Sequence, residues 1–345
     1  MDEAKFIFLK KNLLEQVEKL KNLGLKISYS YKTNNEVGNI LQEISEIDFS
    51  IHTKEEIEMI KNKNKIWFFT QAESEEELKN LLIIGIKKFV VDNELDLQKI
   101  LNTIKNSNER IDLSLRMKFQ EHRIGTGKYF VYGIDSKKVN QIIKEEFENP
   151  LIENLGIHIH RKSQNTSEWE IQTELEDSIT KENLKRIDFI NFGGGLPTEY
   201  KNYTLKIIPY IFQKIKETKN FLENYNIKSY IEPGRFLASP CIKLQTQIIQ
   251  IYEKNIILNT TIYNCALDTI LTGTKMLVEQ ELKDEEEGDY YLIKGNSPTR
   301  DDIFRYKVKL KNPKVGDTIT FLNAGAYNYT TDFFGYKKLK SEIGV

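Results

Sequence analysis

Eight short runs of apolar, β-branched and aromatic residues follow one another through the first two thirds of the chain. The stretches between them carry charged residues with apolar residues three or four positions apart, as Glu75–Leu82 does, which is typical of amphipathic helices. Strands that alternate with helices in this way predict a parallel (β/α)8 barrel. The runs expected to form its strands are Lys26–Tyr31, Asp48–Ile51, Ile66–Thr70, Lys88–Val91, Asp112–Met117, Leu155–His160, Phe189–Phe192 and Ser229–Glu232.

The competing arrangement for this pattern is a doubly wound open sheet. That fold normally carries a glycine-rich turn after its first strand. Residues 30–33 read Ser-Tyr-Lys-Thr and contain no glycine. The sequence therefore favours the barrel.

Alternating apolar and polar residues replace the helical patterns after about residue 236. This change predicts a β-rich second domain. Its expected strands are Lys243–Tyr252, Thr260–Cys265, Tyr290–Lys294, Tyr306–Leu310 and Thr318–Leu322. We therefore expect a barrel over residues 25–235 and a β-barrel or β-sandwich domain over residues 236–345, joined by an N-terminal strand within residues 1–12.

The charges of the chain nearly cancel, with 50 Lys and Arg against 51 Asp and Glu. Such a balance produces no field that would attract nucleic acid or an anionic membrane. Cys241 and Cys265 are too few for a disulfide framework or a cysteine-based metal site. No run approaches the roughly 18 apolar residues that a membrane span needs. We expect a cytoplasmic protein without a bound metal.

Lys32 follows the first expected strand, and the active sites of barrel enzymes lie at the carboxyl ends of their strands. A lysine that forms a Schiff base must be partly desolvated so that its amine is neutral. Taken alone, Lys32 is most simply a surface residue. Further along the chain, His158 and His160 share one face of an expected strand. They could bind a metal, stack on a cofactor ring or lie as hydrogen-bonded residues in a core. The polar residues 161–164 after them favour a functional role.

Two turns have the composition of anion sites. Gly193, Gly194 and Gly195 follow an expected strand, and their backbone N–H groups can approach a phosphate closely, although a tight turn is the alternative. Residues 232–235 read Glu-Pro-Gly-Arg. The carboxylate would suit a pyridine nitrogen and the arginine a phosphate, whereas a buried salt bridge is the alternative.

The order of these features resembles the family of pyridoxal-phosphate-dependent decarboxylases with the alanine racemase fold. The motifs that carry the resemblance are GIHIH, FGGGLP, EPGR, a later aspartate loop at residues 295–302 and NAGAY. The family includes ornithine, lysine, arginine, diaminopimelate and carboxynorspermidine decarboxylases. The resemblance implies pyridoxal 5'-phosphate as cofactor, an amino acid as substrate, and a homodimer in which Ser297–Asp302 completes the partner's active site.

The resemblance also implies a role for single residues. Lys32 matches the Schiff-base lysine, His160 the histidine that stacks on the cofactor ring, and Glu232 the carboxylate that faces the pyridine nitrogen. The residues that match the phosphate site or its turns are Ser163, Gly193, Gly194, Gly195, Gly234, Arg235 and Tyr327. Because alanine racemase is expected to place an arginine at the ring nitrogen, Glu232 favours the decarboxylases.

One position departs from the family. Its polar loop usually carries a cysteine that is expected to deliver the last proton, but here Pro298 or Thr299 takes that place. Thr299, which could hold a water, and Asp302, which matches the family's aspartate, are retained as catalytic candidates. The alternatives are protonation by another group, an altered outcome such as oxidative deamination, and a silent homologue that acts as a binding module.

The substrate is expected to carry a distal cation. Residues 266–272 lack the arginine expected of the diaminopimelate branch. Asp268, Asp301 and Asp302 suit a cation instead, and Cys265 is a further candidate in the same region. The sequence therefore predicts a decarboxylase of ornithine, lysine or arginine in polyamine synthesis, with carboxynorspermidine or diaminopimelate decarboxylase as the alternative.

Overall fold

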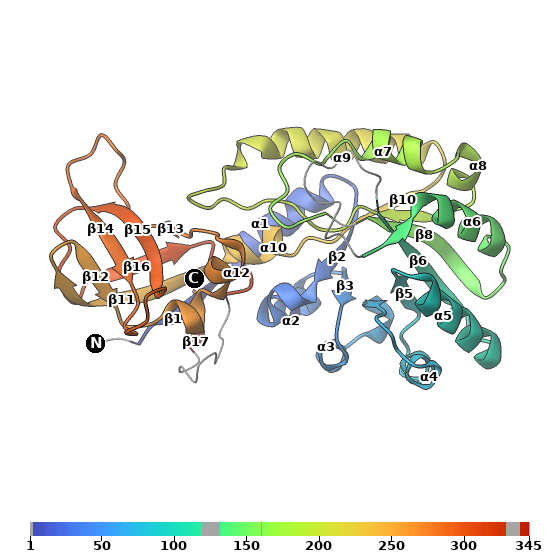
Figure 1. The fold of residues 1–345 in the computed structure, drawn as a ribbon, viewed down its shortest axis with the longest axis horizontal. Helices are drawn as coiled ribbons and strands as arrows, with labels where there is room; N and C mark the ends of the chain where they lie inside the picture. The colour runs from blue at the N-terminus through green and yellow to red at the C-terminus, as the bar shows by residue number, and fades with distance from the viewer. Residues whose placement is uncertain (1–2, 119–131, 160, 329–338, 345) are drawn as a thin grey trace. The chain divides into compact units, whose positions relative to one another are not determined.

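The computed structural model describes residues 3–118, 132–159, 161–328 and 339–344 (Figure 1). The chain divides into two compact units. One unit comprises Lys19–Leu196 and Ile207–Gly234, and the other Met1–Glu18, Pro197–Lys206 and Arg235–Val345. Helix α1 (Lys10–Lys21) runs across this division.

The first unit is a closed parallel barrel, as the sequence predicts. Among the residues that the structure describes, its sheet has nine strands. Strand β7 (Ile134–Asp135) pairs there only with β6, which leaves eight strands in the closed path. The ring closes where β10 pairs with β2 and β5 pairs with β6. The eight strands are β2 (Lys26–Ser30), β3 (Asp48–Ile51), β4 (Ile66–Phe69), β5 (Lys88–Val91), β6 (Ile111–Lys118), β8 (Ile152–Ile159), β9 (Phe189–Asn191) and β10 (Lys228–Ile231).

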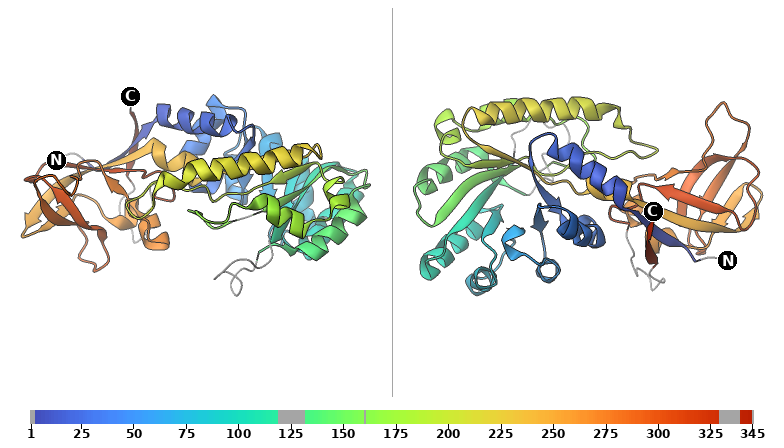
Figure 2. Two further views of the ribbon diagram at one scale, coloured as in Figure 1. Left: turned by 90° about the horizontal axis from the view of Figure 1, so that it is seen from above. Right: turned by 180° about the vertical axis from the view of Figure 1, so that it is seen from behind.

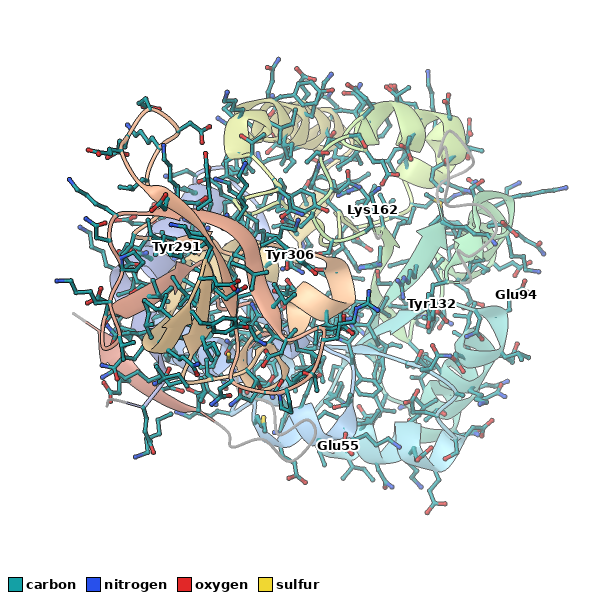
Figure 3. All side chains as sticks on the ribbon, turned by 60° about the vertical axis from the view of Figure 1, so that its left-hand side comes forward. Glu55, Glu94, Tyr132, Lys162, Tyr291 and Tyr306 are labelled. Atoms are coloured by element: carbon teal, nitrogen blue, oxygen red, sulfur yellow. The ribbon has the colours of Figure 1, made fainter. Side chains whose placement is uncertain are left out.

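Helices surround these strands on the outside, as the views from above and behind also show (Figure 2). Polar residues start several of them; Ser74, for example, forms a capping box with Glu77 at α4. Glu55 and Glu94 lie on the outer surface at the starts of their helices (Figure 3). The helices are α2 (Asn35–Ile44), α3 (Lys54–Glu58), α4 (Glu75–Ile83), α5 (Glu94–Ser107), α6 (Ser136–Glu146), α7 (Ile171–Ser178), α8 (Lys181–Leu184) and α9 (Ile208–Glu223), with short 3-10 turns η1 (Tyr31–Thr33) and η2 (Lys63–Lys65).

Large side chains fill the amino-terminal end of the barrel interior. The rings of Trp67, Phe189 and Tyr230 pack against one another. Asp48 accepts hydrogen bonds there from Trp67 Nε1 (3.2 Å) and Lys88 Nζ (2.7 Å). This end is therefore a packed core, which leaves the carboxyl ends of the strands as the place for chemistry.

In its described residues, the second unit contains one eight-stranded sheet. Strand β1 (Lys5–Leu9) pairs with β11 (Ile242–Tyr252), so the first and the last thirds of the chain build this sheet together. The other strands are β12 (Asn255–Leu258), β13 (Leu277–Val278), β14 (Asp289–Lys294), β15 (Ile303–Leu310), β16 (Thr318–Leu322) and β17 (Lys340–Gly344). The remaining helices are α10 (Arg235–Ala238), α11 (Ile262–Cys265) and α12 (Leu267–Thr272), with 3-10 turns η3 (Leu205–Ile207) and η4 (Ser239–Cys241).

The strand predicted at Thr260–Cys265 is wrong, because Ile262–Cys265 is helical. Thr261 caps this helix and forms a capping box with Asn264. The carboxylate of Asp302 accepts the backbone N–H of Ile262 (2.8 Å). These polar contacts stabilise a helix start where the apolar alternation alone indicates a strand.

Throughout the part of the chain that the structure describes, no helix is both long and apolar enough to cross a membrane.

Candidate active site

Three neighbouring strands place Arg116, His158 and Asn191 next to one another. His158 on β8 is the register partner of Arg116 on β6 and of Asn191 on β9. Register partners in a parallel ladder point to the same side of the sheet. His158 is completely buried, and Asn191 is 3% exposed. The barrel interior near the carboxyl ends of these strands is therefore polar.

Glu232 lies at the centre of this polar group, directly after β10. Its carboxylate accepts hydrogen bonds from the Ser50 hydroxyl (2.8 Å) and the Asn191 amide (2.9 Å), and it contacts His158 Nε2 (2.8 Å). Burial by itself would raise the pKa of Glu232, but His158 and the bond from Ser50 outweigh it and lower the pKa to about 2. Glu232 is therefore a buried carboxylate that stays ionised at neutral pH.

Lys32 lies in the 3-10 turn η1 directly after β2. Its side chain is reached by solvent, yet the surrounding end of the barrel lowers its pKa by desolvation. The charge of Arg116 lowers the pKa further, whereas Glu232 opposes the shift. A lysine with a lowered pKa has more of the neutral amine that attacks an aldehyde.

The Glu-Pro-Gly turn fixes the Lys32 turn relative to Glu232. The backbone N–H of Ser30 donates to the carbonyl of Pro233 (3.3 Å). A Cβ atom added to Gly234 would lie 2.2 Å from the Thr33 hydroxyl, so only glycine permits this approach. The predicted role of Gly234 at the phosphate remains a prediction, and its visible role is this close packing.

The glycine run forms a backbone cradle after β9. Gly193 and Gly195 adopt positive φ angles of 67° and 102°, which favour glycine. The backbone N–H of Asn165 donates to the carbonyl of Gly195 (2.9 Å), and a Cβ on Gly195 would approach the carbonyl of Lys162 to 3.0 Å. Glycines with positive φ angles can turn their backbone N–H groups toward an anion, so this run can receive a phosphate group.

The loop after β8 divides into buried and exposed residues. Arg161 is buried, donates to the carbonyl of Phe192 (2.6 Å) and lies over the Trp169 ring at 4.3 Å. It therefore ties the loop to the glycine turn rather than facing solvent. Ser163 is exposed on the same loop. His160 lies outside the described residues.

In the second unit, Arg235 and Asp268 form a buried ion pair. Arg235 Nη2 donates to Asp268 Oδ1 (2.9 Å), and its Nη1 donates to Oδ2 and to the Tyr200 hydroxyl (3.0 Å). Thr272 and Thr274 also donate to the carboxylate (3.0 and 2.6 Å). The carboxylate of Asp268 therefore holds Arg235, and the assignment of Asp268 to a substrate cation stays a prediction. The Tyr327 ring lies 5.2 Å from the same guanidinium.

The polar loop is anchored by Asp302, which is completely buried. Its carboxylate accepts from the backbone N–H of Ser297 (3.0 Å) and from the Ser297 hydroxyl (2.7 Å). The hydroxyls of Ser297 and Thr299 are 2.6 Å apart. Thr299 and Asp301 are exposed, so these two face solvent while Asp302 holds the loop in place.

Cys265 is not a suitable reactive group. It is completely buried, its Sγ donates to the carbonyl of Thr261 (2.9 Å), and burial raises its thiol pKa. Burial raises the pKa of Cys241 in the same way. A buried protonated thiol is inert, and the assignment of Cys265 to substrate contact stays a prediction.

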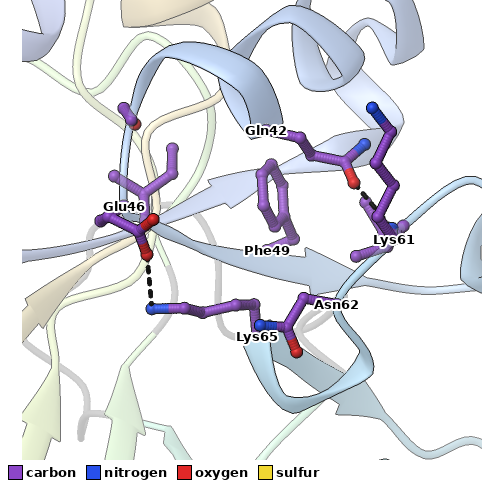
Figure 4. A pocket seen from close by; sticks show the side chains of 9 residues that line it. Gln42, Glu46, Phe49, Lys61, Asn62 and Lys65 are labelled. Atoms are coloured by element: carbon purple, nitrogen blue, oxygen red, sulfur yellow. Dashed lines mark hydrogen bonds and ion pairs between the residues drawn. The ribbon is translucent and has the colours of Figure 1, made fainter.

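A separate pocket lies at the opposite end of the barrel strands (Figure 4). It is lined by residues just before β3 and β4, among them Glu46 and Lys65, whose charged groups are 3.5 Å apart. Gln42 accepts the backbone N–H of Lys61 across it. Because barrel enzymes react at the carboxyl ends of their strands, this pocket is not the active site.

Residues 10–239 match the family model described as "Pyridoxal-dependent decarboxylase, pyridoxal binding domain". The chain belongs to this family. Its enzymes are pyridoxal-dependent decarboxylases, and the cofactor is pyridoxal 5'-phosphate. The residues present fit that group, since a lysine of lowered pKa, an ionised buried carboxylate and a backbone cradle meet at one end of the barrel.

Three known proteins show the range of similarity within this decarboxylase family. The carboxynorspermidine/carboxyspermidine decarboxylase of Campylobacter jejuni is 26% identical over 57% of this chain, and the chain spans 52% of it. The diaminopimelate decarboxylase of Vibrio cholerae is 24% identical over 88% of this chain and 77% of its own length. The solved lysine decarboxylase of Selenomonas ruminantium superposes with a TM-score of 0.81 at 16% identity, covering 99% and 93% of the two chains.

In this decarboxylase, pyridoxal phosphate supplies an electron sink for the bond that breaks. Lys32 would attach it, Glu232 would accept a hydrogen bond from its ring nitrogen, and the glycine cradle would receive its phosphate. Reasoning from the sequence did not identify Ser50 and Asn191, which donate to Glu232, or Arg116, which is the register partner of His158. Their signal was present, because period-two alternation places each on the interior face of its strand.

Proposed function

We propose that this enzyme decarboxylates a small amino acid with a distal cationic group, of the ornithine, lysine or arginine type, and that it serves polyamine synthesis. The observation that carries the proposal is the ionised, buried Glu232 at the barrel end that also bears Lys32. A carboxylate at a pyridine nitrogen keeps that nitrogen protonated, which strengthens the electron sink.

The substrate class rests on the charges of the second unit. The segment from Ala266 to Thr272 contains no cationic side chain, and Asp301 exposes its carboxylate. The alternative substrates are carboxynorspermidine and diaminopimelate, which appear in the names of the relatives from Campylobacter and Vibrio. A homodimer whose loop 297–302 completes the partner's site, with Thr299 and Asp302 near the reaction, is part of the same proposal.

A second candidate follows from the polar loop. Pro298 and Thr299 stand where the family's cysteine is expected, and neither is a thiol. A homologue that holds the cofactor but decarboxylates slowly, yields an aldehyde, or acts as a binding module would have this loop.

The test is CO2 release from ornithine, lysine, arginine, diaminopimelate and carboxynorspermidine, with identification of each product. We expect release from a substrate with a distal cation and an amine as product. Absence of release from all five with the cofactor bound favours the silent homologue, and an aldehyde product favours altered chemistry.

Lys32→Ala is the matched control for cofactor attachment. The wild-type protein should absorb near ~420 nm and lose this band on borohydride treatment, as a lysine-bound pyridoxal requires. Lys32→Ala should lose the borohydride-sensitive band and at least about 1,000-fold of the rate. An unchanged spectrum in the variant would contradict the assignment of Lys32.

A further inference from the structure

We propose that His158 is a positioning residue for Glu232. Its Nε2 carries the proton that the two groups share, and it leaves one acceptor direction of the Glu232 carboxylate open toward the cofactor ring. This inference rests on the proposed function only through the bound cofactor. It does not depend on which amino acid is decarboxylated.

The imidazole of His158 has a fixed position. It is completely buried on β8, and its Nε2 lies 2.8 Å from Glu232 Oε2. The Phe69 ring is nearly perpendicular to it, with the two ring centroids 5.1 Å apart, and Phe69 also stacks on His52 at 4.7 Å. A ring packed in this way cannot turn away from the carboxylate without displacing its neighbours.

The hydrogen bonds of Glu232 leave one acceptor direction for a further donor. A carboxylate offers about four lone-pair directions, two on each oxygen. Ser50 and Asn191 occupy both directions on Oε1, and His158 occupies one on Oε2. Among the described residues no other group donates to this carboxylate, so one direction remains. Any donor that Glu232 receives must share Oε2 with His158.

The proton between the two groups belongs on the histidine. The two atoms that meet are a ring nitrogen and a carboxylate oxygen, so one of them must carry the hydrogen. Although burial opposes ionisation, the contacts of Glu232 lower its pKa to about 2. Nε2 of His158 is therefore the donor, and Glu232 is left as acceptor only.

The charged groups around the pair favour this arrangement. Lys32 and Arg116 contribute positive charge to the same end of the barrel. His52 is neutral, because burial and then the charge of Lys32 lower its pKa to about 3. Glu232 is the carboxylate that faces His158 in the described structure. Loss of the Nε2 donor would free Oε2 and let the carboxylate pKa rise.

The experiment uses the whole holoenzyme without substrate and records the ~420 nm band from pH 6 to 9. We compare His158→Gln, whose terminal amide can place an N–H where Nε2 lies, with His158→Asn, whose amide is too short, and His158→Leu. We expect the pH midpoint of this band to shift by about one pH unit in His158→Leu and in His158→Asn. The midpoint in His158→Gln should equal that of the wild type.

Two further readouts do not depend on the spectrum of the loaded enzyme. In the cofactor-free protein, 15N NMR of the four histidines should show His158 Nε2 as a protonated nitrogen at neutral pH. The Kd for pyridoxal phosphate should rise about tenfold in His158→Leu and recover in His158→Gln. Circular dichroism identifies any variant that does not fold.

The outcomes are separable. A folded His158→Leu with the wild-type pH profile and Kd, or an unprotonated Nε2, overturns the proposal. If every variant fails to fold, the NMR measurement on the wild type still decides it. Failure of the proposed decarboxylation would appear instead as absence of CO2 release and would leave these readouts unaffected.

Discussion

The two units each bury a carboxylate, and the two carboxylates are surrounded in different ways. Asp268 receives two donors on each oxygen, from Arg235, Thr272 and Thr274. Glu232 receives three donors, from Ser50, Asn191 and His158, and none of these three is an arginine or a lysine. A carboxylate whose acceptor directions are all occupied has none left for a ligand, whereas one with an open direction can act on a ligand. Burial alone does not distinguish the two roles.

Asp268→Asn should produce the largest change in stability. It removes the charge that compensates buried Arg235, and loss of one partner of a buried ion pair costs about 3–5 kcal/mol. Urea unfolding of the cofactor-free protein measures it. Asp301→Asn is the matched control, since the side chain of Asp301 is exposed, and it should change the free energy of unfolding by less than about 0.5 kcal/mol. Equal effects of the two variants would remove the distinction between the carboxylates.

Glu232→Gln should change chemistry more than stability. The amide keeps the volume and can still accept from Ser50, but it cannot hold a positive ring nitrogen by charge. We expect a rate of CO2 release lower by about 100-fold and a free energy of unfolding lower by about 1–2 kcal/mol. A large decrease in the free energy of unfolding with an unchanged rate of CO2 release would show that Glu232, like Asp268, has a structural role only.

The smallest of these effects should be the contribution of His52 to the pH dependence of the free energy of unfolding. The pKa of His52 in the folded protein determines the sign of this contribution. The folded pKa of about 3 lies below the ordinary value of 6.5, so between these values the unfolded chain binds more protons. Stability therefore falls as the pH drops from 6.5 toward 3. His52→Phe, which can still stack on Phe69, should remove about 1–2 kcal/mol of this loss at pH 5. Urea unfolding at pH 5 and pH 8 measures how much the free energy of unfolding changes between these pH values. The same change in the wild type and in His52→Phe would contradict the prediction.

The barrel was predictable because eight short runs rich in β-branched and aromatic residues alternate with helical patterns along the chain. The order of their motifs predicted the roles of Lys32, Glu232 and the three glycines, and these roles stay predictions. The partners of Glu232 were harder to see, because strand register joins His158 to Asn191 across 33 residues of sequence. The helix at Ile262–Cys265 was missed for a similar reason, since one of its capping groups is Asp302.

The pairing of β10 with β2 has a further consequence for how the cofactor and the fold affect each other. This ladder joins the last strand of the ring to the first, and it has two register pairs where the other seven have three or more. Lys32 and Glu232 stand on its two sides. A ligand attached to Lys32 and held by Glu232 would connect the two sides of the shortest ladder in the barrel. At 100 times its Kd such a ligand adds about 2.7 kcal/mol to the stability of the closed ring, and hydrogen exchange in β2 and β10 should slow accordingly.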